Sequence, residues 1–548
     1  MRRIRSRRAL AVGGLVAALL WIPPLVSAQA TAPSTTTAQP SNDTEGSRQE
    51  LSPRPSIIRA VTVRGTTVFS QEDFIPLFTW YLHEPLTLAT LEEVAAHVTD
   101  MYRARGYTLA STYVPQQEIR DGYVELAVLE GQLGALSVTG QRAYSEDFIR
   151  KHFAPVMEAR LIRNQDVERS LLLLNGYPEL KTSATLRPGA TPGSTDLDVL
   201  VEDRRPIHLT LDYNNYGFNT VSRHRFGATG EIGNLGIDGS MLTLNGIIGD
   251  KPDQLLFGTA SYAVPLGVHG TKLAASVSTG RFDVGAHLSA LEIRGRISTY
   301  DLSLSHPLVK TRTQTVIVDT GFASKDNRLS TLGSLTGSDR VRLLKAGVNY
   351  DQLDGSGRTY ASVYGFQGVG EVWGGMDNND RLTTRQGADN RFTKGTVSAG
   401  RIQSLPHDLL FILKGSGQIS TGPLVVIEQL LLGGPDSVRG YQLGERFVDE
   451  GYTVSGELRI PVWSSKLPPT QFGVFVDHGG GRVRNPAPGE HRSASLTGVG
   501  FGVQTMLSTW GQTSIRADLG FPLSAQPVGG TLSGDRSPTL YLQAIARF

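Results

Sequence analysis

The stretch Leu431-Leu-Gly-Gly-Pro-Asp-Ser-Val-Arg-Gly-Tyr441 places an arginine, Arg439, in a glycine-rich loop between segments in which apolar and polar residues alternate. A second stretch, Phe475-Val-Asp-His-Gly479, puts Asp477 inside one of these alternating segments. Where the two faces of a strand meet lipid and a lumen, a charge is costly unless it is paired. The two stretches together predict a loop that folds into a β-barrel and is held there by an ion pair between Arg439 and Asp477.

Alternation of this kind continues through the last two thirds of the chain. In the final segment an apolar face is formed by Leu540, Leu542, Ala544, Ala546 and Phe548. We count about sixteen such segments: residues 209–213, 225–234, 241–249, 254–264, 272–282, 294–306, 313–322, 340–350, 359–369, 392–402, 408–417, 453–462, 470–479, 496–506, 513–520 and 538–548. A soluble β-sandwich is the alternative, but its core would need more large apolar residues. The pattern predicts a transmembrane β-barrel of about sixteen antiparallel strands over residues 205–548.

The connecting segments indicate which end of the barrel faces which side. Short connectors such as residues 265–270 are expected at the periplasmic end, and long polar ones such as residues 325–339 and 373–391 at the outer end. One segment carries alternating glycines at positions 498, 500 and 502. Glycine inside a strand marks a close approach by a side chain or another backbone, so we expect such a neighbour there rather than a phosphate-binding loop.

The N-terminus has the composition of a secretory signal. Residues 2–8 contain five arginines, an apolar run covers residues 9–22, and Val26-Ser-Ala28 fits a cleavage site. The apolar run is shorter than the roughly 18 residues that a spanning helix needs, so residues 1–28 are predicted to be a signal peptide. Residues 29–55, rich in Ser, Thr, Pro and Gln, are predicted to be a disordered tether. Within it, only residues 45–51, interrupted by Gly46, offer a short plug helix.

Between tether and barrel, helix and strand patterns alternate in two modules of similar order. In the first, residues 56–132, strands are expected at 57–68, 108–114 and 122–129, and helices at 71–81 and 90–105. Thr90 and Glu93 predict a capping box for the second helix, and Gly106 predicts its end. In the second, residues 133–204, strands are expected at 136–138, 182–186 and 196–202, and helices at 145–153 and 164–175. Two α+β modules are therefore expected before the barrel.

Composition excludes several classes of function. The chain has 53 Lys+Arg and 51 Asp+Glu, for a net charge of +2, which argues against a general nucleic-acid binder. It has no cysteine, so disulfides, thiolate catalysis and cysteine-ligated zinc are excluded. The 11 histidines show no metal-ligand spacing, and nucleophile-elbow and phosphate-loop motifs are missing. We expect neither catalysis nor a metal or other cofactor.

The pairing of Arg439 with Asp477 has a physical argument of its own. A guanidinium keeps its charge at any working pH and forks onto a carboxylate through two parallel hydrogen bonds. Removing one partner of such a buried pair costs about 3–5 kcal/mol, so its best use is to fix a loop in one position. On this chemistry alone, a surface arginine and an aspartate that only lines the pore remain an equal alternative.

In combination the motifs resemble the two-partner secretion transporters of the outer membrane (TpsB type, the hemolysin secretion/activation protein family). The string Gly433-Gly-Pro-Asp-Ser-Val-Arg-Gly-Tyr441, with Gly456-Glu-Leu-Arg-Ile-Pro461 after it, resembles their sixth extracellular loop and the next strand. The resemblance implies that the loop tip enters the lumen and that its arginine pairs with the aspartate of a strand motif. The residues concerned are Val438, Arg439, Gly440 and Tyr441 in the loop, and Phe475, Asp477 and Gly479 in the strand.

The upstream modules resemble two polypeptide-transport-associated (POTRA) domains, over Tyr102-Arg-Ala-Arg-Gly-Tyr107, Val114-Pro-Gln-Gln117 and Glu130-Gly131. The resemblance, which covers roughly residues 56–548, implies an outer-membrane pore of a Gram-negative bacterium with its POTRA domains in the periplasm. Such a pore captures one large secreted exoprotein and translocates it unfolded, without nucleotide hydrolysis. Capture is expected at strand edges near Val114, Gln116 and Glu125, by β-augmentation. Phe548 is the expected terminal signal for the barrel-assembly machinery.

Two other functions remain open from the sequence. A barrel-assembly insertase of the same superfamily usually has more periplasmic modules than two, and a passive porin would need no folded periplasmic arm. The expected partners are the exoprotein, the assembly machinery and membrane lipid, with no nucleic acid. The sequence does not identify the exoprotein as a hemolysin, an adhesin or a contact-dependent toxin, nor does it give the oligomeric state.

Overall fold

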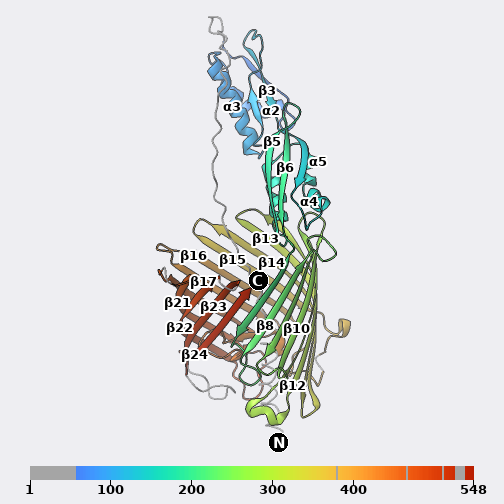
Figure 1. Ribbon diagram of the computed structural model, residues 1–548, viewed down its shortest axis with the longest axis vertical. Coiled ribbons are helices and arrows are strands. Elements are labelled where there is room, and N and C mark those ends of the chain that lie inside the picture. Colours follow the sequence, from blue (N-terminus) through green and yellow to red (C-terminus); the bar gives the residue numbers. More distant parts are fainter. Residues whose placement is uncertain (1–56, 378–379, 465–466, 509–510, 525–536) are drawn as a thin grey trace.

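The computed structural model describes residues 57–377, 380–464, 467–508, 511–524 and 537–548. A slender arm of two α+β modules leads into a large β-barrel (Figure 1). The predicted signal peptide and the tether with its short plug helix, residues 1–55, lie outside the described residues. Within the described ranges, no helix is long and apolar enough to cross a membrane.

Sixteen strands close into one antiparallel barrel, as the alternating pattern predicts. The last strand, β24, pairs with the first, β7, and completes the wall. The strands are β7 (Ile207–Asn214), β8 (Arg225–Gly233), β9 (Met241–Gly249), β10 (Leu255–Leu266), β11 (Thr271–Asp283), β12 (Arg294–Lys310), β13 (Gln314–Thr331), β14 (Ser334–Asp354), β15 (Gly357–Gly368), β16 (Thr393–Ser404), β17 (Leu410–Ser420), β20 (Glu450–Pro461), β21 (Thr470–Arg482), β22 (Ser493–Leu507), β23 (Gln512–Pro522) and β24 (Thr539–Arg547).

The seam between β24 and β7 is the shortest pairing of the described wall. Its register joins 5 residue pairs, whereas β13 and β14 join 18. The main chain of Phe548 adds two hydrogen bonds with Leu209 (2.9 and 3.3 Å). The side chain of Asn215 bonds the main chains of Leu540 and Leu542 (2.9 and 2.7 Å) at the other end. Closure of the barrel therefore depends on a small number of residues.

The prediction of an outer loop at residues 325–339 is wrong, because these residues extend the two longest strands. β13 and β14 remain paired up to Thr331 and Ser334, so only Leu332 and Gly333 form the turn. Both have positive φ (51° and 75°), the geometry of the two-residue turn that suits a β-hairpin. The polar residues that suggested a loop are lumen-facing or outward-facing strand positions. The other long connector, residues 373–391, does lie between β15 and β16.

The first module packs two helices on a three-stranded sheet of order β1-β3-β2. Its elements are β1 (Ala60–Arg64), α2 (Gln71–Thr79), α3 (Leu88–Ala104), β2 (Ser111–Tyr113) and β3 (Tyr123–Leu129). β1 is much shorter than the strand predicted over residues 57–68. It ends at Arg64, just before Gly65, whose φ is 82° and where a Cβ would stand 2.5 Å from the Val128 carbonyl oxygen.

The predicted capping box of Thr90 and Glu93 is also wrong, because α3 begins earlier. Thr87 caps the helix, and its hydroxyl accepts a hydrogen bond from the Thr90 amide (3.1 Å). The helix ends before Gly106, which has a φ of 89°, as predicted. The period of the apolar residues located the helix correctly, but a threonine three residues upstream was the better cap.

The second module has a sheet of order β4-β6-β5 and rests on the barrel. Its elements are β4 (Gln132–Thr139), α4 (Glu146–His152), α5 (Ala154–Ala159), α6 (Asn164–Leu174), β5 (Leu180–Pro188) and β6 (Ser194–Asp203). The Ser145 amide donates to the Asp238 carboxylate in the turn after β8 (3.1 Å). Glu168 pairs with Arg312 in the turn after β12 (2.8 Å). The connector at residues 265–270 lies at this end too, where a Cβ on Gly270 would stand 2.6 Å from Leu173.

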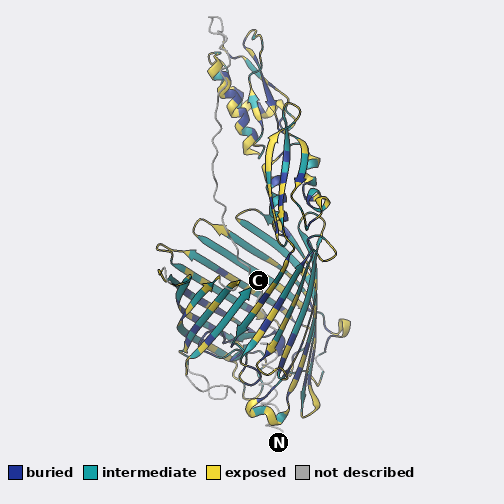
Figure 2. Cartoon of the chain, in the orientation of Figure 1, coloured by how far each residue is buried: buried dark blue, intermediate teal, exposed yellow. Residues whose placement is uncertain are grey.

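Hydrophobic cores lie inside both modules, and a third lies inside the barrel. The barrel core is built from the halves of β10–β16 that are farther from the modules and from the connectors at that end. At its centre, Phe282, Ile297 and Phe392 are at most 1% exposed. Buried positions of these strands therefore lie toward the end away from the arm (Figure 2). The outer half of the lumen is filled by protein.

Candidate functional site

The connector between β17 and β20, residues 421–449, folds into the barrel lumen, and we call it the lumen loop. It contains a short turn, η3 (Val426–Glu428), and a hairpin of β18 (Leu430–Leu432) and β19 (Arg446–Val448). Leu424, Leu432, Val438 and Val448 are fully buried. Such burial of a connector is unusual, since loops normally run over the surface. Its tip, residues 433–445, lies against the wall.

Arg439, in the tip, is 1% exposed, and so is Asp477 on β21. The guanidinium donates two hydrogen bonds to the Asp477 carboxylate, from Nε to Oδ2 (2.7 Å) and from Nη2 to Oδ1 (2.9 Å). The Arg439 amide donates a third to Oδ2 (3.0 Å). The guanidinium carbon lies 3.3 Å from the centre of the Phe475 ring, a favourable cation–π contact. The structure brings these predicted residues together in the forked geometry.

Arg439 has two further acidic neighbours that the sequence analysis did not single out. Its Nη1 donates to Glu457 Oε2 on β20 (2.7 Å) and lies 3.5 Å from Asp518 Oδ2 on β23. Arg516 bonds both carboxylates (3.0 and 2.8 Å), and Arg459 bonds Glu457 (2.7 Å). Three arginines thus face three carboxylates. This balance matters because a buried charge without a partner costs several kcal/mol.

A signal for these extra residues is present in the sequence. Glu457 and Arg459 are two residues apart in the strand string Gly456-Glu-Leu-Arg-Ile-Pro461, and Arg516 and Asp518 have the same spacing in a later segment. Residues two apart in a strand share a face. Two such charged pairs, one on each of two barrel strands, are the pattern that predicts a network of ion pairs facing the lumen.

The other motif residues pack the tip against the wall. Val438 lies against Gly479, where a Cβ would stand 2.9 Å from Val438 Cγ2. Gly440 has a φ of 103°, a conformation that glycine adopts without strain. Its amide donates a hydrogen bond to the Tyr541 hydroxyl on β24 (3.0 Å). Gly440 in the tip and Gly479 in the wall therefore permit the close contact between tip and wall.

The alternating glycines of β22 make room for this network, as predicted. A Cβ on Gly498 would stand 1.8 Å from the Arg439 carbonyl oxygen, and one on Gly500 would stand 2.4 Å from the Phe475 ring. A Cβ on Gly502 would stand 1.9 Å from the Asp518 carboxylate. Because glycine has no side chain, these positions of the wall leave space for the tip and its partners.

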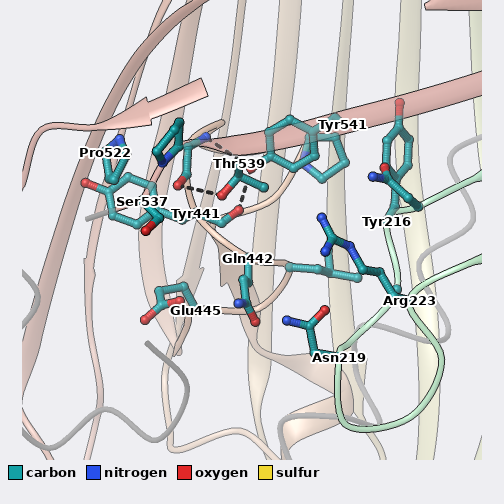
Figure 3. A pocket seen from close by; sticks show the side chains of 16 residues that line it. Tyr216, Asn219, Arg223, Tyr441, Gln442, Glu445, Pro522, Ser537, Thr539 and Tyr541 are labelled. Carbon is teal, nitrogen blue, oxygen red and sulfur yellow. Dashed lines mark hydrogen bonds between the residues drawn. The ribbon is translucent and has the colours of Figure 1, made fainter. Parts of the chain in front are cut away.

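A cavity of about 190 Å³ lies beside the tip, between the lumen loop, the connector after β7 and the start of β24. Figure 3 shows Tyr441 and Tyr541 near one another on its wall, with Asn219 and Arg223 across from them. The Tyr441 hydroxyl donates to the Thr497 carbonyl (2.8 Å), and the Tyr541 hydroxyl donates to the Tyr441 carbonyl (2.5 Å). These bonds fix the residues that follow Arg439.

The base of the lumen loop is held by a second buried ion pair. Asp449, which is fully buried, accepts two hydrogen bonds from Arg385 in the connector after β15, one of them from Nη2 at 2.8 Å. Asp449 also accepts a hydrogen bond from the amide of Leu424 (2.8 Å), near the other end of the loop. One carboxylate therefore joins both ends of the lumen loop to a neighbouring connector.

Glu428 anchors the first part of the loop to the wall. It is 2% exposed and accepts hydrogen bonds from Lys325 on β13 (2.7 Å) and Lys394 on β16 (2.5 Å). Neither these residues nor the Arg385–Asp449 pair could be identified from the sequence. The partners are 34 to 103 residues apart in the chain and follow no recognisable spacing.

The arrangement is suited to holding a loop in one place. In the described parts of the chain, no group of three or more His, Asp or Glu side chains is placed to hold a metal ion. Glu457, Asp477 and Asp518 each bond an arginine instead. The interactions at both ends of the lumen loop are directional and buried, so the loop has one well-defined position.

The residues expected to mark periplasmic strand edges lie in the first module. Val114 follows β2 and packs against the core, and Gln116 is exposed. The prediction that Glu125 lies at an edge is wrong, because it belongs to the central strand β3. The Gln117 side chain also bonds the Glu125 amide and carbonyl (2.9 and 2.7 Å). The sheet edge near Val114 is β2.

Glu130, at the end of the first module, is a buried carboxylate held by neutral donors. It accepts hydrogen bonds from the amides of Thr67 and Val68 (2.6 and 3.0 Å), from the Thr67 hydroxyl and from the Tyr102 hydroxyl (2.7 Å). Burial alone would raise the pKa of Glu130, but these hydrogen bonds outweigh burial and hold its pKa below the ordinary value. Burial and the bond to Glu130 raise the pKa of Tyr102. The carboxylate fastens the loop after β1 to the end of β3.

Comparison with known families covers most of the chain. Residues 193–505 match the family model described as haemolysin secretion/activation protein ShlB/FhaC/HecB, and residues 56–131 match the ShlB-type POTRA domain. The heme/hemopexin transporter protein HuxB of Haemophilus influenzae is 24% identical over 457 residues, which cover 81% of this chain and 79% of that protein. The outer membrane transporter CdiB of Dickeya dadantii is 24% identical over 482 residues, 85% of this chain and 83% of that protein.

Solved structures share the fold. CdiB from Escherichia coli matches with a TM-score of 0.75 at 19% identity, covering 100% of this chain and 98% of that one. CdiB from Acinetobacter baumannii matches with 0.69 at 17%, covering 91% of each chain. BamA from Haemophilus ducreyi, lacking POTRA domains 1–3, matches with 0.53 at 14%, covering 90% and 100%. The matched family region is more than half of the chain, and the protein therefore belongs to the haemolysin secretion/activation family of two-partner secretion outer-membrane transporters, with an N-terminal ShlB-type POTRA domain.

Proposed function

We propose that this transporter recognises one large exoprotein in the periplasm and passes it unfolded through the barrel to the cell surface, without nucleotide hydrolysis. The observation that carries the proposal is the lumen loop, held in the passage by Arg439 and its three carboxylates. A passive pore would not need the folded periplasmic arm that precedes the barrel. The names of relatives support a transport role, since HuxB is a heme/hemopexin transporter protein and CdiB an outer membrane transporter.

Capture of the exoprotein is assigned to the first POTRA domain. β2 is the outer strand of its sheet, and the side of β2 away from β3 pairs with no other described strand. An extended segment of an unfolded chain can add to such an edge through main-chain hydrogen bonds. Tyr113 on β2 (45% exposed) and Tyr123 on β3 (63% exposed) lie on the same sheet face and offer apolar contacts beside that edge. Gln116 follows the same strand.

The lumen offers a polar entrance and a closed exit. In the half nearer the POTRA domains, a partly buried ion pair of Arg358 with Asp351 (2.7 Å) lines the wall, and Lys345 pairs with Asp301 (2.5 Å) near the middle of the wall. The outer half is filled by the apolar core and the lumen loop. Export therefore requires the connectors of the outer half to move aside while an extended segment passes. Folding of the exoprotein outside the cell would drive the movement.

The proposal is tested by co-expression with a candidate exoprotein, which we expect to be encoded by a neighbouring reading frame. We expect the exoprotein to appear at the cell surface with the intact chain. It should remain in the periplasm when residues 57–131 are deleted, while the amount of folded barrel in the membrane stays the same. Equal export by the deleted chain would remove the capture role. If loss of the protein instead lowered the levels of unrelated outer-membrane barrels, the insertase function would replace the proposed one.

A further inference from the structure

A row of three arginines crosses the outer face of the barrel wall. Strand register places Arg281 of β11 opposite Arg296 of β12, and Arg296 opposite Arg328 of β13. All three side chains are exposed. We call these residues the arginine row. Like charges directly opposite one another on neighbouring strands are destabilising, so the row needs an explanation.

The row points away from the lumen. Its sequence neighbours Phe282, Ile297 and Leu329 are buried in the core inside the barrel. Successive residues of a strand face opposite sides, so the arginines face outward. The strand ends that carry the row are those farther from the POTRA domains, because Arg312, at the opposite end of β12, pairs with Glu168 of the second module.

Nearby arginines on the same face are paired, and the row is not. The paired ones are Arg294 with Asp283 (3.5 Å), Arg340 with Asp380 (3.0 Å) and Arg342 with Asp326 (2.8 Å). Over the described residues, no carboxylate or other acceptor is within bonding distance of Arg281, Arg296 or Arg328. None of the three arginines therefore has a bonded counter-charge, although the Asp283 carboxylate, which bonds Arg294, also attracts Arg281.

The arginine row lies just beyond the band of apolar side chains on the outer face of the wall. On β12 the same outward face carries Tyr300, Leu302 and Leu304, which are 54%, 50% and 38% exposed. Aromatic residues mark the interface in outer-membrane barrels. Arg296 lies four residues beyond Tyr300, which at about 3.3 Å per residue and a strand tilt of about 40° places it roughly 10 Å farther along the membrane normal. This distance reaches the headgroup layer.

We propose that the arginine row binds the phosphate groups of a lipid headgroup in the outer leaflet. Guanidinium groups fork onto phosphate oxygens, and basic clusters beside a membrane attract anionic headgroups. Neighbouring strands are about 4.8 Å apart, so the row spans roughly 10 Å, a width that suits a headgroup with two phosphates. The proposal needs the barrel to sit in an outer membrane, but it is independent of protein export.

The test uses the full chain, folded in a zwitterionic detergent, and three lipids: diphosphoryl lipid A, monophosphoryl lipid A and phosphatidylcholine. Native mass spectrometry counts the lipids bound across a titration. We expect diphosphoryl lipid A to bind at least 10-fold more tightly than phosphatidylcholine, with monophosphoryl lipid A between them. The double variant Arg296→Gln/Arg328→Gln should lose at least 10-fold of that affinity. Equal affinity for diphosphoryl lipid A and phosphatidylcholine in the wild type would overturn the proposal.

The matched control is Lys251→Gln/Arg492→Gln, which removes the same charge from exposed sites in outer connectors. The control should bind diphosphoryl lipid A as the wild type does, and an equal loss in both variants would show that only net charge matters and would overturn the proposal. If the double row variant lacks the heat-modifiable gel mobility of a folded barrel, the single Arg296→Gln variant is measured in its place. A loss of at least 3-fold would support the proposal, and unchanged affinity would refute it.

Discussion

Arg439 in the barrel and Glu130 in the first POTRA domain are both charged groups withdrawn from water, at 1% and 5% exposure. Each fixes a loop to a sheet, but they are stabilised in different ways. Arg439 meets three carboxylates, whereas Glu130 meets only the amides and hydroxyls of Thr67, Val68 and Tyr102. A counter-charge keeps the first group ionised at all working pH values. Neutral donors leave the second able to take up a proton, so pH should distinguish the two.

The largest effect is expected from Arg439→Ala. The change leaves three buried carboxylates with two arginines, at a cost of about 3–5 kcal/mol to the local structure. Export of the exoprotein should fall at least 10-fold, with little loss of folded barrel on heat-modifiability gels. The matched control is Arg401→Ala, which removes an arginine whose pair with Asp354 is partly exposed (26% and 36%) and is worth less than about 1 kcal/mol. Equal loss of export in both variants would contradict a special role for Arg439.

The next effect is expected from Gly498→Ala, which leaves every charge in place. The added Cβ would stand 1.8 Å from the Arg439 carbonyl oxygen, so the tip must shift. We expect export to fall about 5-fold, less than in Arg439→Ala, because overpacking by one methyl costs about 1–3 kcal/mol. Gly246→Ala on β9, where nothing lies within 4 Å of the added Cβ, should export normally. Full export by the Gly498 variant would mean that the tip need not stay in position.

A smaller effect is expected from Arg385→Ala at the base of the lumen loop. Asp449 loses its forked partner but keeps the amides of Leu424 (2.8 Å) and Arg484 (2.6 Å), so the cost should lie near the low end, about 3 kcal/mol. We expect faster hydrogen exchange at the Leu424 amide and a 2- to 3-fold change in export. Exchange as slow as in the wild type would show that the neutral donors suffice at Asp449, as they do at Glu130.

The smallest effect is expected from Glu130→Gln. Loss of the charge weakens four hydrogen bonds and should cost the POTRA domain about 1.5–3 kcal/mol. Because the pKa of Glu130 in the folded domain is below its ordinary value of 4.5, its charge stabilises the fold above that pH. This contribution is lost as pH falls through the folded pKa. Pulse proteolysis of the arm in the full chain should show falling stability below about pH 4.5 in the wild type, and a shallower decline in Glu130→Gln.

The barrel could be predicted from a local pattern, whereas the tip contact also needed the resemblance of the Arg439 loop and the Asp477 strand to the family motifs. Alternation over short segments gave sixteen strands, and the glycine-rich string with Arg439 named the tip. The hairpin end at Leu332 and Gly333 was missed because polar strand residues that face a lumen look like a loop in sequence. The Arg385–Asp449 pair was missed for another reason, since two charges 64 residues apart meet only after both connectors have folded inward. Glu130 has no charged partner to suggest its burial.

The Asp477 carboxylate accepts hydrogen bonds from two parts of Arg439, the guanidinium and the main-chain amide (3.0 Å). Every residue type except proline could donate the hydrogen bond from the main-chain amide at position 439. Asp477 therefore holds part of the tip through the main chain, and this hydrogen bond does not require the guanidinium. A variant at position 439 should therefore keep one of these contacts to β21, whereas loss of Asp477 removes the acceptor of both donors at once.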